Sequence, residues 1–266
     1  MRKFLAYFRQ SLADAFIYRA TGFIWMLNDL GPALIMLLFW LAAFKNRPSV
    51  SGYTPGAMIV YYLGVMLINN LVSFQPQYFL SDEIRTGQFS NYLVKPINLT
   101  AYKLAGVLCW RLVRLIFFLP AMLVITKLFS RQLQSLDFSQ LNFSLFLAGL
   151  VLAFLLNFFI KLVLGLLTFW FLEAGWIFFI FEVLASFFSG EALPLDLFPP
   201  SLNLINNLLP FKYLLYFPLS LLLGRAGNSR ELLLGFAMAV FWTVVSYGLY
   251  RRVLHKGIRN YCAYGG

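Results

Sequence analysis

Charged residues are scarce in this chain, making up 12% of its 266 residues, whereas 61% are hydrophobic. A soluble domain usually contains about 25% charged and about 45–50% apolar residues. A water-soluble fold of this length has too little interior to cover 30 phenylalanines together with the other apolar side chains. The composition therefore predicts an integral membrane protein.

Histidine and cysteine are scarcer still, with one histidine and two cysteines in the whole sequence. A metal site built from several such ligands is excluded by counting, so we expect no metal on this chain. The P-loop pattern G-x-x-x-x-G-K-[ST] and the nucleophile pattern G-x-S-x-G are also missing. We therefore expect no catalytic residue and no cofactor on this chain.

Long apolar runs are what the sequence has instead. Because a spanning helix needs about 20 mainly apolar residues, these runs predict an all-α membrane protein with six transmembrane helices in a single domain, residues 1–266. The expected spans are Phe23–Phe44, Ala57–Leu80, Leu104–Leu128, Phe143–Phe171, Gly175–Ser189 and Leu232–Tyr250. The short turn FLEAGW predicts that the fourth and fifth spans form an antiparallel pair.

Residues 1–22 follow a different pattern. Phe4, Phe8, Leu12 and Phe16 recur every four residues, and charged residues occupy other faces. This spacing describes an amphipathic helix that lies in the membrane interface. A cytosolic extension of the first span is the alternative interpretation.

The basic surplus, a formal net charge of +11, indicates anionic lipid head groups as the partner. We expect no nucleic acid, because basic and aromatic residues are not interleaved as in nucleic-acid-binding segments. With the N-terminus in the cytoplasm, most loop lysines and arginines fall on the cytoplasmic side, as the positive-inside rule requires. Six spans then place the C-terminus and its basic segment RRVLHKGIR on the same side.

The region 190–230 is apolar but interrupted. Within it, Ser201–Gly224 is long enough to span a membrane, yet it contains three asparagines and two prolines. Because prolines break helices, we expect a re-entrant extracellular hairpin before the last span. A seventh span is the alternative, and it would place RRVLHKGIR outside the cell.

A polar stretch, SDEIRTGQFSNYLVKPIN (Ser81–Asn98), separates the second and third spans, and we call it the elbow. Ser81 is expected to cap a short helix that has Asp82 and Glu83 in its first turn. Gly87 should interrupt this helix.

A second helical piece of the elbow, Gln88–Val94, is expected to present Phe89, Tyr92 and Leu93 on one face. It should stop at Pro96, because the residue before a proline is pushed out of the helical region. The face is either part of an amphipathic loop that rests on lipid head groups or a surface that docks into the groove of a cytosolic partner.

Ionisable residues inside a predicted span cost about 2.5–3.5 kcal/mol on insertion scales and therefore indicate function by default. Arg111 and Arg114 share one helical face, and either they snorkel to the cytoplasmic surface or they contact an anionic substrate or a partner helix. Lys161 and Glu182 either pair between two helices or line a transport path. Asp29 is the fifth residue of this kind.

The segment EIRTGQFSNYLVKP, Glu83–Pro96, resembles the E-x-R-x-G-x-x-x-x-x-L-x-x-P loop that follows the second helix of type-2 ABC transporter (ABC-2) permeases. Two later segments, Ser189–Pro200 and Leu209–Gly224, resemble the region between the fifth and sixth helices of the same family. The subgroup that the chain resembles most is the daunorubicin-resistance-like one.

The resemblance implies that the elbow is a coupling helix seated in a separate ATPase subunit, which carries the ATP and Mg. The residues expected to dock or to shape this helix are Asp82, Glu83, Arg85, Gly87, Phe89, Tyr92, Leu93 and Pro96. Many relatives carry an acidic residue where Asn91 stands, so no salt bridge is expected there.

The resemblance further implies a second permease chain, a pathway at the interface of the two chains, and export of a lipid, glycan, drug or peptide across a bacterial cytoplasmic membrane. Two other functions stay open at this point. One is a self-contained secondary transporter or channel, and the other is a membrane scaffold that transports nothing.

Overall fold

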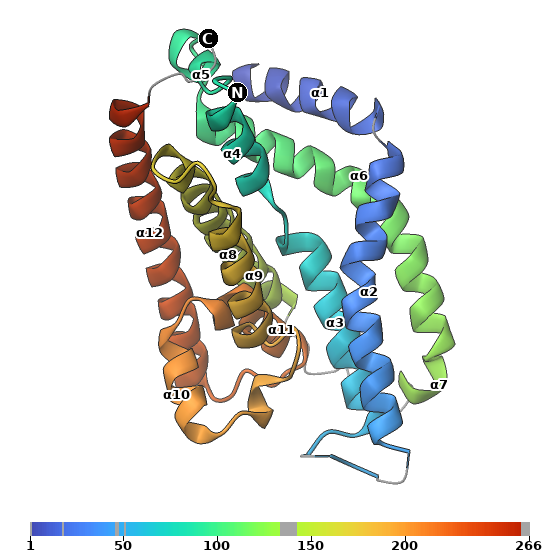
Figure 1. Ribbon diagram of the computed structural model, residues 1–266. Helices are drawn as coiled ribbons and strands as arrows, with labels where there is room; N and C mark the ends of the chain where they lie inside the picture. The colour runs from blue at the N-terminus through green and yellow to red at the C-terminus, as the bar shows by residue number, and fades with distance from the viewer. Residues whose placement is uncertain (1, 18, 46–47, 51, 134–142, 262–266) are drawn as a thin grey trace.

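The computed structural model describes residues 2–17, 19–45, 48–50, 52–133 and 143–261. Every regular element within these ranges is a helix. In Figure 1 the helices pack side by side, with α1 (Arg2–Ile17) and the C-terminal end of α12 (Ser229–Asn260) at one end and α10 (Pro200–Leu208) at the other. We call these the elbow end and the far end.

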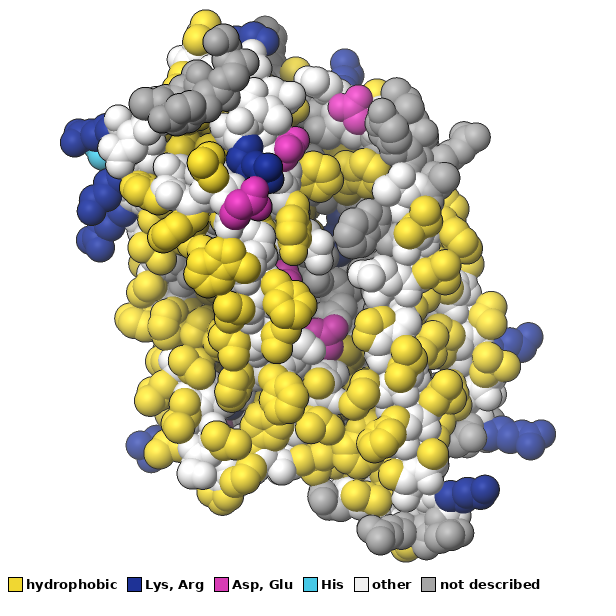
Figure 2. Space-filling view, viewed as in Figure 1, with side chains coloured by type: hydrophobic (Ala, Val, Ile, Leu, Met, Phe, Trp, Pro, Cys, Tyr) yellow, Lys and Arg dark blue, Asp and Glu magenta, His cyan; other side chains and the backbone are white. Residues whose placement is uncertain are grey.

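Five segments of the described chain are long and apolar enough to cross a membrane. Four of them consist of one principal helix each, and the remaining segment, Pro55–Arg85, combines two helices. The single ones are α2 (Arg19–Ala43), α6 (Leu99–Leu128), α8 (Phe143–Leu166, continued by the 3-10 turn η1, Leu167–Phe169) and α12. Hydrophobic side chains cover most of the visible face, as expected for a surface in contact with lipid (Figure 2).

The fifth expected span, α9 (Gly175–Phe188), is an apolar helix of 14 residues. At 1.5 Å per residue it extends about 21 Å, which is less than the hydrocarbon thickness of about 30 Å. It lies beside α8 (Figure 1), and its residue Phe178 packs against Leu164 of α8.

The second span is broken in the middle, although one continuous helix was expected over Ala57–Leu80. Its first half, α3 (Pro55–Val72), is capped by Ser73, and its second half, α4 (Pro76–Arg85), begins at Pro76. Proline suits a first helical turn because it lacks an N–H group, and it disfavours helical geometry in the residue before it. Gln75 accordingly has φ −129° and ψ 56°.

The break also changes the role of Ser81. This residue lies inside α4, is buried, and accepts a hydrogen bond of 2.8 Å from the hydroxyl of Thr168. The prediction that Ser81 caps a helix is therefore wrong, because α4 already begins at Pro76. As a result, Asp82 and Glu83 lie in the last turn of α4 and not in a first turn.

The N-terminal helix α1 crosses α6 at the elbow end (Figure 1). The rings of Tyr7 and Tyr102 are 5.5 Å apart, and the thiol of Cys109 donates a hydrogen bond of 3.2 Å to the carbonyl of Phe8. Helix α1 therefore packs on α6 along one face, and it runs in a different direction from α2 (Figure 1).

The region 190–230 forms four short helices at the far end. They are η2 (Leu195–Leu197), α10, η3 (Phe211–Leu214) and α11 (Tyr216–Leu222). Each is too short to span a membrane. Helix α11 is nevertheless inserted into the bundle, since Leu219 is fully buried and packs where Gly64 of α3 has no side chain.

Candidate functional site

The elbow begins within the last turns of α4 and continues through a turn into one short helix, α5 (Ser90–Val94). Gly87 has φ 77°, a left-handed geometry that is common just after a helix and that glycine adopts without strain. Helix α5 ends before Pro96, and Lys95 is extended, with φ −94° and ψ 149°. The expected stop at Pro96 is thus present, and α5 begins two residues later than the expected piece Gln88–Val94.

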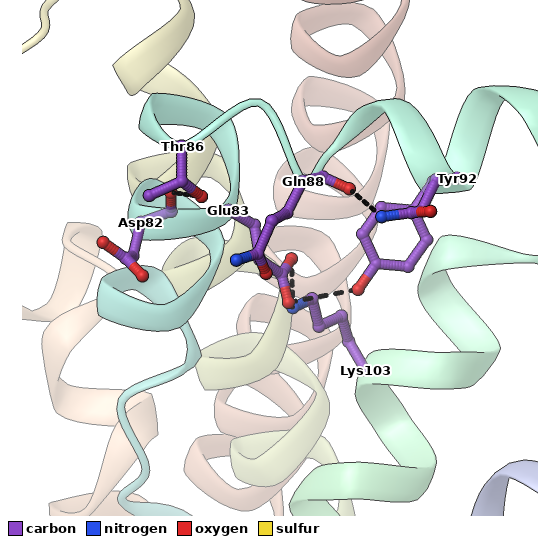
Figure 3. A network of polar contacts seen from close by, with 7 residues as sticks. Asp82, Glu83, Thr86, Gln88, Tyr92 and Lys103 are labelled. Carbon is purple, nitrogen blue, oxygen red and sulfur yellow. Dashed lines mark hydrogen bonds and ion pairs between the residues drawn. The ribbon is translucent and has the colours of Figure 1, made fainter. Parts of the chain in front are cut away.

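The elbow is attached to α6 through the carboxylate of Glu83, which binds Lys103 and Tyr92 (Figure 3). The ammonium group of Lys103 lies 2.7 and 2.6 Å from the two carboxylate oxygens of Glu83, and the phenol of Tyr92 donates to the same carboxylate at 3.1 Å. Burial, followed by the negative charge of Glu83, raises the pKa of Tyr92, so that its phenol stays protonated and remains a donor. These contacts join α4, α5 and α6 into one unit.

The aromatic face of the elbow does not point outward as expected. Phe89 is 1% exposed, and its ring lies 5.1 Å from that of Phe169 and 5.4 Å from that of Tyr261. Phe89 therefore cannot be a docking contact, because it fills a pocket of this chain. The apolar side chains that α5 does expose are Leu93, at 46%, and Val94, at 84%.

Two further elbow residues are exposed to solvent. Arg85 forms a loose ion pair with Glu173, with 3.6 Å between Arg85 Nη2 and Glu173 Oε1. Thr86 donates a hydrogen bond to the carbonyl of Asp82 at 2.8 Å (Figure 3), which helps to finish α4. The Thr86 contact is thus local to the end of α4, whereas Arg85 reaches a residue in the turn before α9.

Arg111 does not snorkel to the surface, because it is bound to the backbone of another helix. It is 6% exposed, and its guanidinium donates to the carbonyl oxygens of Asn70 and Ser73, at the end of α3 where the second span breaks. Asn157 of α8 donates to the carbonyl of Val72 at 2.7 Å. Carbonyl groups freed by a helix break inside a membrane need such donors.

Lys161 and Glu182 form an ion pair that joins α8 to α9, as the interhelical interpretation of these residues predicts. Gln77 of α4 donates to the same carboxylate at 3.1 Å. Gln77 and Asn157 were not among the predicted site residues, although both are polar residues within long apolar runs. That position in the sequence was the available signal for both.

Arg114 faces a cavity of about 230 Å³ that lies between α1, α4 and α6 and is also lined by Lys103 and Arg111. Figure 2 shows a hollow in this part of the face, with a basic side chain inside it. The side chain of Asp29 lies outside the described residues. Among the described residues, no three His, Cys, Asp or Glu side chains come together as metal ligands would.

Comparison with known proteins gives one family. The family model described as "ABC-2 family transporter protein" matches residues 30–265. No curated protein matches the chain significantly. The matched range includes the elbow, the broken span and the four short helices of the far end.

Proposed function

We propose, from the premise that this chain belongs to the ABC-2 family of transporter proteins, that it is the permease of an exporter and that its ATPase partner docks on the elbow. Family membership itself makes the chain a multi-pass membrane component of an ABC transporter, and such a permease associates with an ABC ATPase subunit. The docking surface, the direction of transport and the pairing with a second permease chain belong to the proposal.

The observation that carries the proposal is the exposed apolar tip of α5. Leu93 and Val94 stand at the end of the bundle where the long α12 helix also ends (Figure 1). That end of α12 bears exposed basic residues, namely Arg251, Arg252, Lys256 and Arg259. By the positive-inside rule this is the cytoplasmic side, where a cytosolic ATPase subunit reaches the elbow.

The contacts of the elbow supply a path for movement. Motion of the docked subunits pushes α5, and the Glu83 contacts transmit the push to α4 and α6 as one unit. Because Arg111 of α6 holds the end of α3, α3 pivots at this contact, and the non-helical residues between α3 and α4 accommodate the change in angle. In this account the elbow is a rigid lever, and the break in the second span is its hinge.

We place both termini in the cytoplasm of a bacterial cell and the short helices of the far end on the outer side of its cytoplasmic membrane. The ATP and Mg belong to the ATPase subunits. The transported molecule is a lipid, glycan, drug or peptide, the cargo classes that the family resemblance implies.

Co-purification tests the docking surface. We expect the double substitution Leu93→Asp and Val94→Asp to abolish retention of the ABC ATPase subunit that serves this permease and to remove ATP-dependent transport. Leu204→Asp is the matched control, because Leu204 is 68% exposed on α10 at the far end. Equal retention of the ATPase by both variants would show that the elbow tip is not the docking site.

A further inference from the structure

A second and larger cavity lies at the far end, away from the elbow. Its volume is about 620 Å³, and its walls come from η2, α10, η3, α11 and the first turns of α12; we call it the far-end cavity. Pockets that hold small molecules usually have volumes of about 300–1,000 Å³. The far-end cavity is therefore large enough for a ligand and not only for water.

Side-chain amides from α10 form one part of its wall, namely those of Asn203, Asn206 and Asn207. Asn206 is 1% exposed, and within the described chain neither its Nδ2 nor its Oδ1 has a hydrogen-bond partner. An amide offers two donors and one acceptor oxygen, and buried groups of this kind are nearly always bonded in folded proteins. Asn206 thus supplies the cavity wall with a buried amide whose hydrogen-bonding groups are unpaired within the described chain.

Aromatic rings form another part of the wall, contributed by Tyr213, Tyr216 and Phe217. The rings of Tyr213 and Phe217 are 5.9 Å apart, and Gly235 of α12 makes room for Phe217, since a Cβ at Gly235 would run into that ring. Ring faces beside amides suit a ligand that has both apolar C–H surface and hydrogen-bonding groups.

The charged groups of the wall cancel one another. Asp196 and Glu231 are balanced by Lys212 and Arg225. The carboxylate of Asp196 also accepts hydrogen bonds from two phenols, those of Tyr53 and Tyr216. A wall with no net charge does not favour an anion such as phosphate, so the cavity favours a neutral ligand with many hydrogen-bonding groups.

From these observations we propose that the far-end cavity binds a neutral, polyhydroxylated ligand, that is, a sugar unit. Hydroxyl groups both donate and accept, as the amides of the wall require, and the C–H faces of a sugar ring pack on aromatic rings. The same chemistry is presented by a free saccharide and by the head group of a glycolipid. This binding needs no ATPase, so it stands or falls independently of docking at the elbow.

The test uses the full chain in lipid nanodiscs free of glycolipid and of sugar-based detergent. Saturation-transfer NMR and calorimetry would measure binding of disaccharides built from glucose, galactose, mannose or N-acetylglucosamine. Inorganic phosphate and trialanine serve as an anionic and a zwitterionic probe. Nanodiscs doped with a monoglucosyl diacylglycerol, titrated with the disaccharide that binds best, distinguish a glycolipid source, which competes, from a free saccharide, which binds unchanged.

Asn206→Leu is the decisive variant. It removes the unpartnered amide and keeps a side chain of similar size, so the protein should unfold at the same temperature or a higher one. We expect its saccharide affinity to fall by at least about tenfold, as for the loss of hydrogen bonds to a buried group. Asn260→Leu, at the elbow end of α12, is the control and should bind as the wild type does.

Saccharide binding by the wild type and by the cavity variants decides whether the far-end cavity is a sugar site. Saturable saccharide binding that is lost in Asn206→Leu supports it, and Asn207→Leu provides the same test should the first variant fail to fold. Absence of binding by every disaccharide and by the glycolipid, binding of phosphate or trialanine in their place, or unchanged affinity in a folded cavity variant would overturn it.

Discussion

Two lysine–glutamate pairs hold short helices to long ones in this molecule, and their surroundings differ. At the elbow end, Lys103 of the long α6 holds Glu83 of α4, and the two side chains are 9% and 22% exposed. In the bundle, Lys161 of the long α8 holds Glu182 of α9, with exposures of 3% and 33%. In both pairs the lysine is the more deeply buried member.

We infer that the Lys103–Glu83 pair (the elbow pair) transmits movement, whereas the Lys161–Glu182 pair (the bundle pair) holds helices together. The elbow pair includes the phenol of Tyr92, and it joins three elements that a docked partner can push together. In the bundle pair, Gln77 donates to Glu182, and the Lys161 nitrogen lies 5.2 Å from the ring centroid of Phe181, so the pair ties α9 to the interior beside the broken span. Its loss should therefore affect folding first, whereas loss of the elbow pair should affect coupling first.

The largest effect on stability is expected from Lys161→Met. This change leaves the carboxylate of Glu182 without its cation, and breaking one side of a buried pair costs about 3–5 kcal/mol. Because Glu182 is one-third exposed, we expect a value near the lower limit, about 3 kcal/mol. Thermal unfolding in detergent, followed by loss of the monodisperse chromatographic peak, measures it.

The matched control for this variant adds Glu182→Leu to Lys161→Met. Removing both charges should restore most of the lost stability, because no unpaired charge is then left in the bundle. An unfolding temperature for Lys161→Met equal to that of the wild type would show that the bundle pair has no structural role.

Glu83→Gln should have a smaller effect on stability and a larger one on coupling. Hydrogen bonds to charged groups contribute about 1.5–3 kcal/mol, and the amide oxygen of the glutamine can still accept one such bond from the buried ammonium of Lys103. We expect the ATPase subunit to be retained but transport per ATP hydrolysed to fall, since the elbow no longer moves with α6. Reconstituted vesicles with both activities assayed in parallel would measure this ratio.

Exchange of the two charges, Glu83→Lys with Lys103→Glu, supplies the control for the elbow pair. The exchange keeps an ion pair at the same place, so coupling should return in part. If Glu83→Gln alone transported as much per ATP hydrolysed as the wild type, the elbow pair would have no special role in coupling.

Arg85→Ala should have the smallest effect. Its ion pair with Glu173 is long, and the two side chains are 49% and 83% exposed. Exposed pairs contribute about 0–1 kcal/mol. The same unfolding assay should show a shift close to its error, and a large loss of stability would mean that Arg85 has another role in the fold.

Much of this architecture can be read from hydropathy, because long apolar runs leave few alternatives to spanning helices. The spans around α2, α6, α8 and α12 lie where the sequence places them. The break between α3 and α4 was missed, since hydropathy averaged over about 20 residues hides one proline in an apolar run. Pro76 was the local signal for it.

The site was less predictable than the fold. Helical spacing groups Phe89 with Tyr92 and Leu93, but it cannot show which way the group faces. The direction depends on Phe169 and Tyr261, which are distant in sequence and close the pocket around Phe89. The pairing of Lys161 with Glu182 was accessible because a tight turn makes their helices antiparallel neighbours.

The central claim, that the tip of α5 contacts the ATPase subunit, is tested most directly by cross-linking. In a chain with Cys109 and Cys262 replaced by serine, Val94→Cys would be treated in native membranes with a short bifunctional maleimide. Our account predicts a cross-linked product with the ATPase subunit, and none from Leu204→Cys at the far end. Absence of the product from Val94→Cys, while the complex remains intact by co-purification, would contradict the account.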